Sequence, residues 1–308
     1  MVLSVLDLGS NSFHLATYRV RERGDRIERR GRTKVMCRLG AGTLWDGAID
    51  DAAWRRGTAA LDRLYRRAMA GEPDRLIAVA TSAIRDADNG ADFCRAARRR
   101  LGLDIEVLSG EEEAHLVYWG ARSALPRRTG RIAVIDVGGG SAEIAVGDGR
   151  ACRFAACLPL GVLRLRDLAP ERVAAQVRGS ARDAMARVRA QRPERVVMTS
   201  GTARRLASVA LGLGLRRHDA CELSRDSLAG LVGALPQLRG KDLDALGVEE
   251  GRRDTILHGA LALEALLDMS GAPAALVATR GLREGVALRE LGRAPVARVA
   301  VRAARRAA

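Results

Sequence analysis

The apolar and polar positions of the chain follow one order of short β-type runs and longer helical runs, and this order occurs twice. Residues 2–6 and 132–135 are continuous aliphatic runs without helical period, which predicts two buried strands. Each run ends at an aspartate, continues through a glycine-containing turn and is followed by another apolar run. The pattern therefore predicts a strand, a tight turn and an antiparallel strand, built twice.

The remaining periodicity predicts the other elements of each half. In the first half we expect strands near 15–20, 33–38, 76–81 and 105–108, and helices at 51–69, 91–101 and 110–124. In the second half we expect strands at 131–136, 142–147, 151–158, 195–198 and 275–278, and helices at 170–190, from 200, at 227–235, at 255–267 and after 281. Ser109 and Glu112 match a capping box at the start of the helix that begins near residue 110.

The best domain boundary lies at residues 126–130, because proline and glycine stop both helices and strands. The expected fold class is a duplicated α/β fold with two domains, 1–125 and 126–308, that flank an interdomain cleft. Ligands of α/β folds bind beyond the carboxyl ends of strands, where both glycine turns lie.

The composition limits the class of protein. A hydrophobic share of 47% in 308 residues supports substantial cores, and no apolar run reaches the length of a membrane span. The chain starts directly with a strand pattern instead of a signal peptide, so we expect a cytoplasmic protein. The five cysteines form no metal-binding spacing, so we expect reduced thiols that mostly fill the core, and no zinc site.

The formal net charge is +15, and all but two of the 52 basic residues are arginines. Such a surface attracts polyanions, which include nucleic acid, polyphosphate and phosphorylated nucleotides, and charge alone does not separate these partners. The alanine-rich basic tail from Arg293 is expected to be a solvated end and not a nucleic-acid arm.

The two glycine turns are the candidate phosphate site. A glycine turn leaves successive backbone N–H groups free to face one anion, and two opposed turns would hold a phosphate between them. The aspartate before each turn, Asp7 and Asp136, offers hard oxygen to Mg²⁺. The expected phosphate ligands in the turns are Gly9, Ser10, Asn11, Ser12, Gly138, Gly139, Gly140 and Ser141.

Helical geometry separates the members of the acidic run 111–113. Glu112 projects away from the apolar face of the helix that begins near residue 110, whereas Glu113 lies roughly 60° from the centre of that face. Glu113 is therefore expected to face the interior or the cleft, where burial would raise its pKa toward a value that suits a general base.

Seven short motifs resemble those of one family. They occur in order as Asp7-Leu-Gly-Ser-Asn-Ser-Phe-His, Thr81-Ser-Ala-Ile-Arg, Ser109-Gly-Glu-Glu-Glu-Ala, Asp136-Val-Gly-Gly-Gly-Ser-Ala-Glu, Leu158-Pro-Leu-Gly, Ser200-Gly-Thr and Arg280-Gly-Leu-Arg-Glu-Gly. The whole chain resembles the exopolyphosphatase / guanosine pentaphosphate phosphohydrolase family, in its short two-domain form. The resemblance implies the actin-like ATPase fold.

The resemblance also implies roles for individual residues. Glu113 would be the catalytic base, Glu143 would orient water or metal, and Arg85 and Arg252 would surround the polyanion. Mg²⁺ (or Mn²⁺) would be the cofactor, with Asp7, Asp136 and Glu143 near it, and the protein would be a homodimer. Residues 277–280 depart from the family, which commonly has a Ser-Asp pair there, so no ligand is assigned near Thr279.

These features together predict a phosphoanhydride hydrolase that removes the terminal phosphate from inorganic polyphosphate. Guanosine pentaphosphate is the alternative substrate. An ATP-dependent kinase of the same superfamily and a non-catalytic sensor of guanosine polyphosphates or nucleic acid are alternatives from other classes. No membrane partner and no specific nucleic acid are expected.

Overall fold

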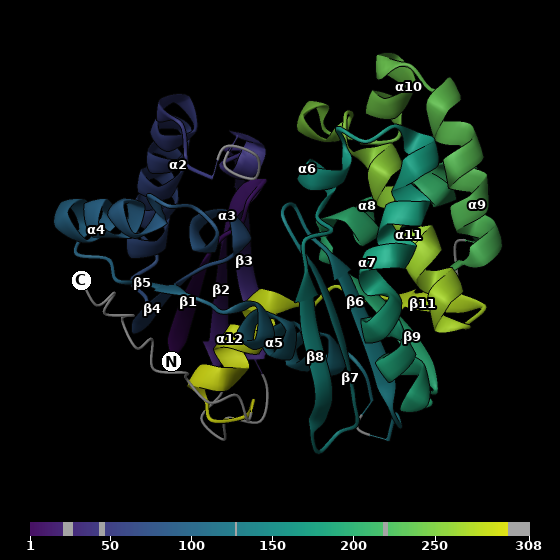
Figure 1. Cartoon of the computed structure of the whole chain (residues 1–308). Coiled ribbons are helices and arrows are strands. Elements are labelled where there is room, and N and C mark those ends of the chain that lie inside the picture. The colour runs from purple at the N-terminus through teal and green to yellow at the C-terminus, as the bar shows by residue number, and fades with distance from the viewer. Residues whose placement is uncertain (21–26, 43–46, 127, 218–220, 295–308) are drawn as a thin grey trace, which may run out of the picture.

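The computed structural model describes residues 1–20, 27–42, 47–126, 128–217 and 221–294, which form two lobes, each built on a mixed β-sheet (Figure 1). The first sheet has the order β3-β2-β1-β4-β5 and the second has the order β10-β11-β9-β6-β7-β8. In both sheets the first strand of the repeat pairs antiparallel with the next strand and parallel with a later one. The duplicated α/β fold expected from the sequence is confirmed.

The elements of the first lobe are β1 Val2–Leu8, β2 Ser12–Val20, β3 Ile27–Met36, α2 Asp51–Met69, β4 Arg75–Ala80, α3 Ser82–Arg85, α4 Gly90–Leu101, β5 Ile105–Val107 and α5 Gly110–Arg122. Those that follow are β6 Ile132–Val137, β7 Ala142–Gly147, β8 Cys152–Leu158, α6 Val162–Leu165, α7 Pro170–Ala190, β9 Arg195–Thr199, α8 Ser200–Gly212, β10 Glu222–Ser224, α9 Arg225–Ala234, η1 Leu235–Gln237, α10 Gly240–Ala245, η2 Glu250–Arg252, α11 Ile256–Ser270, β11 Ala274–Val277 and α12 Leu282–Glu290.

The apolar patterns locate the long elements well and the short ones poorly. The helix at 51–69 and the strand at 142–147 have the predicted bounds. β3 begins at Ile27, six residues before the predicted start, because its polar, exposed residues at this sheet edge carry no apolar alternation. The elements α3, α6, β10, α10, η1 and η2 are too short for a periodic signal and were not predicted.

The start of α5 follows its prediction in one respect and differs in another. Ser109 and Glu112 form the expected capping box: the Ser109 Oγ accepts from the Glu112 N–H at 3.2 Å, and the Ser109 N–H donates to the Glu112 carboxylate at 2.9 Å. Glu112 is nevertheless buried, because the capping geometry folds its side chain back over the helix end.

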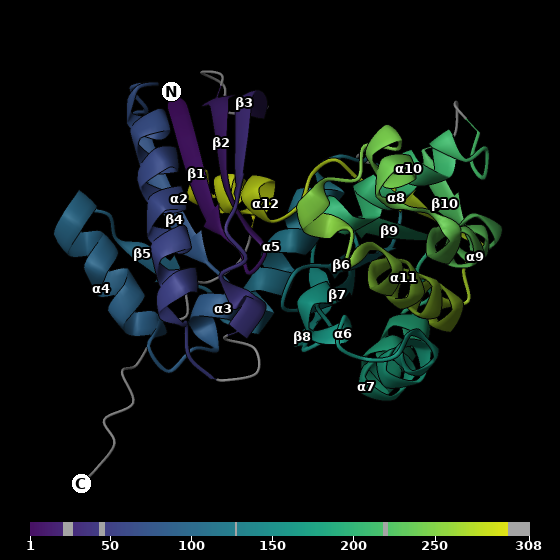
Figure 2. The same ribbon diagram turned by 90° about the horizontal axis from the view of Figure 1, so that it is seen from above.

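Helices α5 and α12 cross where the two lobes meet (Figures 1 and 2). They approach closely at two glycines: a Cβ on Gly120 would lie 1.8 Å from the Gly281 oxygen, and one on Gly285 would lie 1.9 Å from the Leu116 oxygen. α5 contributes Leu116 to the apolar cluster of the first sheet, and the following residue, Val117, to a cluster on the second sheet. One helix therefore belongs to both cores.

The chain returns to the first lobe after the second sheet is complete. Val286 and Ala287 of α12 share a buried cluster with Leu3 and Val5 of β1. The boundary at 125/126 stays a prediction, and we propose that α12 be counted with the first lobe. The predicted solvated tail lies almost entirely outside the described residues. Within them, no helix is both long and apolar enough to cross a membrane.

Candidate functional site

The two glycine turns face each other across the cleft between the lobes. A Cβ on Gly140 would lie 2.6 Å from the Ser10 Oγ, and one on Gly139 would lie 3.0 Å from the Asn11 nitrogen. The hydroxyls of Ser10 and Ser82, which both approach Gly140, are 2.7 Å apart. Only glycine permits this contact, so the turns of the two lobes form one site. A cavity of about 130 Å³ lies there.

Hydrogen bonds from the start of α6 fix the backbone of the second glycine turn. The backbone N–H groups of Val162 and Leu163, at the start of α6, donate to the carbonyls of Gly138 and Gly139 at 3.0 and 2.8 Å. Within the described parts of the chain, the N–H groups of Gly139 and Gly140 have no protein acceptor, and neither do those of Ser10 and Asn11 in the first turn. Unpaired N–H groups from two turns at one cavity suit an anion.

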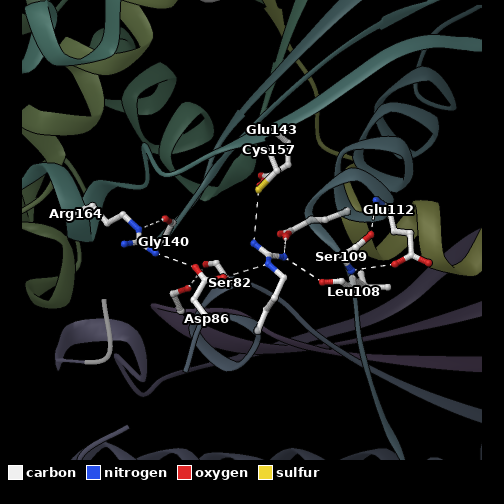
Figure 3. A network of polar contacts seen from close by, with 12 residues as sticks. Ser82, Asp86, Leu108, Ser109, Glu112, Gly140, Glu143, Cys157 and Arg164 are labelled. Atoms are coloured by element: carbon white, nitrogen blue, oxygen red, sulfur yellow. Dashed lines mark hydrogen bonds and ion pairs between the residues drawn. The ribbon is translucent and has the colours of Figure 1, made fainter. Parts of the chain in front are cut away.

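Two carboxylates and a thiol meet beside the turns. One ligand atom each of Glu113, Glu143 and Cys157 lies within 4.8 Å of the others, the only such group of metal-binding type among the described residues. The Cys157 Sγ donates to the Glu143 Oε1 at 3.4 Å (Figure 3). Glu113 comes from the first turn of α5 and Glu143 from β7, so each lobe supplies one carboxylate.

Burial raises the pKa values of the carboxylates in the cleft. The pKa of Glu113 rises to about 7 because burial outweighs the opposing effect of Arg85. The pKa of Asp136 rises to about 6 by burial, against the nearby charge of Arg204. Burial and then the charge of Glu113 raise the pKa of Glu143 well above its usual value. The site therefore concentrates negative charge that a cation would stabilise.

Arg85 contacts Glu113 but is not among the residues that line the cavity. Its Nη1 donates to the Glu113 Oε2 at 2.7 Å and to the Leu108 carbonyl at 3.1 Å, and its Nε donates to Asp86 at 3.3 Å. These contacts hold one carboxylate oxygen of Glu113. The geometry thus places Arg85 beside the candidate base, while its expected contact with phosphate stays a prediction.

The two aspartates differ in their surroundings. The Arg283 Nη1 donates to the Asp7 Oδ2 at 2.8 Å, so Asp7 already has a cationic partner in the protein. Asp136 has no hydrogen bond or ion pair within the described ranges, and the buried Asn11 Oδ1 also lacks a partner. Asp136 and Asn11 therefore have oxygens available to a ligand, and Asp7 has fewer.

The other sequence-predicted residues also lie at this cavity. Ser12, Ser141 and Arg252 line it, and the Ser12 Oγ lies 2.9 Å from the His14 Nε2. His14 pairs with Asp7 across the first hairpin as Glu143 pairs with Asp136 across the second, so the two residues occupy equivalent places in the repeat. Burial, with Arg283 next, lowers the pKa of His14 well below its usual value, so its ring is neutral.

Several site residues were not selected from the sequence. Arg283 belongs to the Arg280-Gly-Leu-Arg motif, which was recognised in the sequence without a role being assigned to this arginine. Arg204 follows the Ser200-Gly-Thr motif by two residues and also lines the cavity. Cys157, which the sequence did not distinguish from the other four cysteines, is a neighbour of both carboxylates.

Comparisons with known proteins agree with this architecture. The chain is 31% identical to exopolyphosphatase 1 of Mycobacterium tuberculosis over 309 aligned positions, which cover 94% of this chain and 88% of the relative. The crystal structure of an exopolyphosphatase from Cytophaga hutchinsonii has a TM-score of 0.87 at 24% identity, over 97% of this chain and all of that one. A family member from Aquifex aeolicus has a TM-score of 0.74 at 23% identity, over 94% and 97%. The model of the Ppx/GppA phosphatase family matches residues 19–294, and the chain belongs to that family.

Proposed function

We propose that the protein is an exopolyphosphatase, which hydrolyses the terminal phosphoanhydride bond of inorganic polyphosphate. The observation that carries the proposal is the meeting of Glu113 and Glu143, one from each lobe, beside two facing turns with unpaired N–H groups. The likeness to exopolyphosphatase 1 of M. tuberculosis supports the same reaction class.

In the proposed reaction, the terminal phosphate lies between the turns and accepts hydrogen bonds from their N–H groups and from Ser12 and Ser141. Glu113 takes a proton from a water molecule that attacks the terminal phosphorus in line with the scissile bond. The bond from phosphorus to the bridging oxygen breaks, and that oxygen leaves with the shortened chain. Arg85 holds one oxygen of Glu113, so the other oxygen is available to the water.

The carboxylates fit a divalent cation, Mg²⁺ or Mn²⁺. The Asn11 Oδ1 and the Asp136 carboxylate have no hydrogen-bond partner among the described residues, and burial raises the pKa values of Asp136 and Glu143. Asp136 and Glu143 would hold the ion, and Asp7 would act through water because Arg283 occupies one of its oxygens. When bound, the ion offsets the charge of the phosphate oxygens.

The alternative substrate is guanosine pentaphosphate. The described residues that line the cavity include no tryptophan, tyrosine or phenylalanine on which a guanine base would stack, and they include Arg204, Arg252 and Arg283. This composition supports polyphosphate. A cytoplasmic location and a homodimer remain part of the proposal.

The test compares phosphate release from polyphosphates of several lengths with release from guanosine pentaphosphate, with and without Mg²⁺ or Mn²⁺. We expect a higher kcat/KM for polyphosphate, and activity that is lost on chelation and falls with added salt. Preference for guanosine pentaphosphate would select the alternative substrate. Formation of ADP from ATP with a phosphorylated acceptor would indicate a kinase, and binding of guanosine polyphosphate or DNA without turnover would indicate a sensor.

A further inference from the structure

The cavity has a basic end that the proposed chemistry does not use. Four cations surround His14: Lys34 is its cross-strand partner on β3, and Arg204, Arg252 and Arg283 also act on it electrostatically. Arg204, Arg252 and Arg283 line the cavity themselves. We call Lys34, Arg204, Arg252 and Arg283 the basic end.

Among the described residues, carboxylates form ion pairs with three of the four cations of the basic end. Asp7 pairs with Arg283 at 2.8 Å, and Glu249 pairs with both Lys34 and Arg252, the latter at 3.4 Å. Arg204, which is half-buried and lines the cavity, has no hydrogen bond or ion pair with any described residue, although the charge of Asp136 acts on it. Burial, and then the charge of Arg283, lower its pKa to about 10.

Because Arg204 lines the cavity and donates to no described residue, its N–H groups are available to a ligand there. It lies on α8, whose first residues follow β9, and Thr199 at the end of β9 is the cross-strand neighbour of Asp136. Arg252 extends over the same helix start, where a Cβ on Gly201 would lie 2.6 Å from its Nη2. Both guanidinium groups therefore border the part of the cavity that adjoins the second glycine turn.

Two arginines outside the basic end differ from Arg204. Arg85 and Arg164 each have carboxylate partners: Arg85 contacts Glu113, and the Arg164 Nη2 contacts Asp86 at 2.8 Å (Figure 3). An incoming polyanion meets less unsatisfied positive charge at these two arginines than at the basic end. The charge distribution gives the substrate chain one favoured direction, with its end at Glu113 and Glu143 and its remainder toward Arg204.

We propose that Arg204 is the binding residue for the phosphate next to the terminal one, with Arg252 and Lys34 receiving the phosphates that follow. A guanidinium grips a phosphate through two parallel N–H donors, which suits Arg204 to a fixed subsite. This assignment rests on the proposed function, because it requires a substrate with consecutive phosphates. It also gives the Ser200-Gly-Thr segment a role, as the start of the helix that presents Arg204.

The test measures binding of two probes by calorimetry. Orthophosphate fills only the terminal subsite, whereas methylenediphosphonate, which is not hydrolysed, spans the terminal and second subsites. In Arg204→Gln we expect diphosphonate to bind about 10- to 100-fold more weakly, as for loss of a charged hydrogen-bonding partner, and orthophosphate to bind within about threefold of wild type. Arg204→Lys should recover part of the loss, because it keeps the charge without the two-pronged geometry.

Arg182→Gln is the matched control, since it removes one exposed arginine from α7 in the same lobe and should change neither affinity. The thermal midpoint of ligand-free Arg204→Gln should lie close to that of wild type, because Arg204 makes no hydrogen bond or ion pair with a described residue. A clear decrease would indicate a structural role and overturn the proposal. Equal weakening of both probes, no weakening of either, or no binding of either to wild type would also overturn it. Release of phosphate by wild type tests the proposed function separately.

Discussion

The substitution Glu113→Gln tests the centre of the proposed reaction. The change removes the ability to take a proton while leaving the size of the side chain nearly unchanged. The amide oxygen still accepts from Arg85, which lies 2.7 Å from the carboxylate, and Asp86 continues to partner Arg85. We therefore expect the fold and the binding of phosphate to persist.

The expected size of the effect follows from the role of the residue. A positioned general base typically contributes about 10²- to 10⁴-fold to the rate, or about 3–5 kcal/mol of transition-state stabilisation. The pKa of about 7 for Glu113 means that close to half of the molecules carry the ionised base at neutral pH. In wild type, kcat/KM should fall about tenfold for each pH unit below this pKa, and the variant should lack this acid limb.

The assay is steady-state release of phosphate from polyphosphate between pH 5 and about 9, with calorimetric binding of methylenediphosphonate measured in parallel. Glu111→Gln is the matched control, because Glu111 precedes the site on the same helix turn but is exposed. Turnover of Glu113→Gln within about threefold of wild type would refute the reasoning. An acid limb that persists in the variant would assign that ionisation to another group.

Two further predictions concern stability. The pKa of Glu113 is raised from 4.5 to about 7, so between these pH values the folded protein retains a proton that the unfolded chain releases. The contribution of this proton to the free energy of unfolding is fully present below about pH 4.5. It is lost as the pH rises to about 7, and the loss amounts to about 3 kcal/mol. Denaturant titrations across this interval should show a smaller decline in Glu113→Gln, and an unchanged decline would contradict the assignment. Gly120→Ala should destabilise by at least about 1–3 kcal/mol, because its Cβ would overlap the Gly281 oxygen, whereas Gly179→Ala, in an open position of α7, should stabilise by up to about 1 kcal/mol. Equal thermal midpoints for the two alanine variants would show that α5 and α12 do not pack tightly in solution.

Much of the fold was predictable because its signals are local. Apolar runs without helical period specified β1 and β6, and the aspartate and glycine after each run specified the hairpins. The face of α5 that carries Glu113 followed from helical geometry alone, and this residue does line the cavity. In contrast, Cys157 was indistinguishable from a core cysteine, because its contact with Glu143 joins β7 and β8 and leaves no trace in spacing.

The sequence by itself determined the repeated strand–turn–strand units, the long helices and the residue types of the candidate site, since each depends on neighbouring residues in the chain. The tertiary structure alone decided which charges compensate each other. It paired Asp7 with Arg283, which is distant in sequence, placed α12 on the first lobe, and left Arg204 at the cavity without a hydrogen bond or ion pair to any described residue. These outcomes depend on packing between segments that are distant in sequence. The energy of a charge is set by its burial and by its distance from other charges, and no local sequence pattern encodes either quantity.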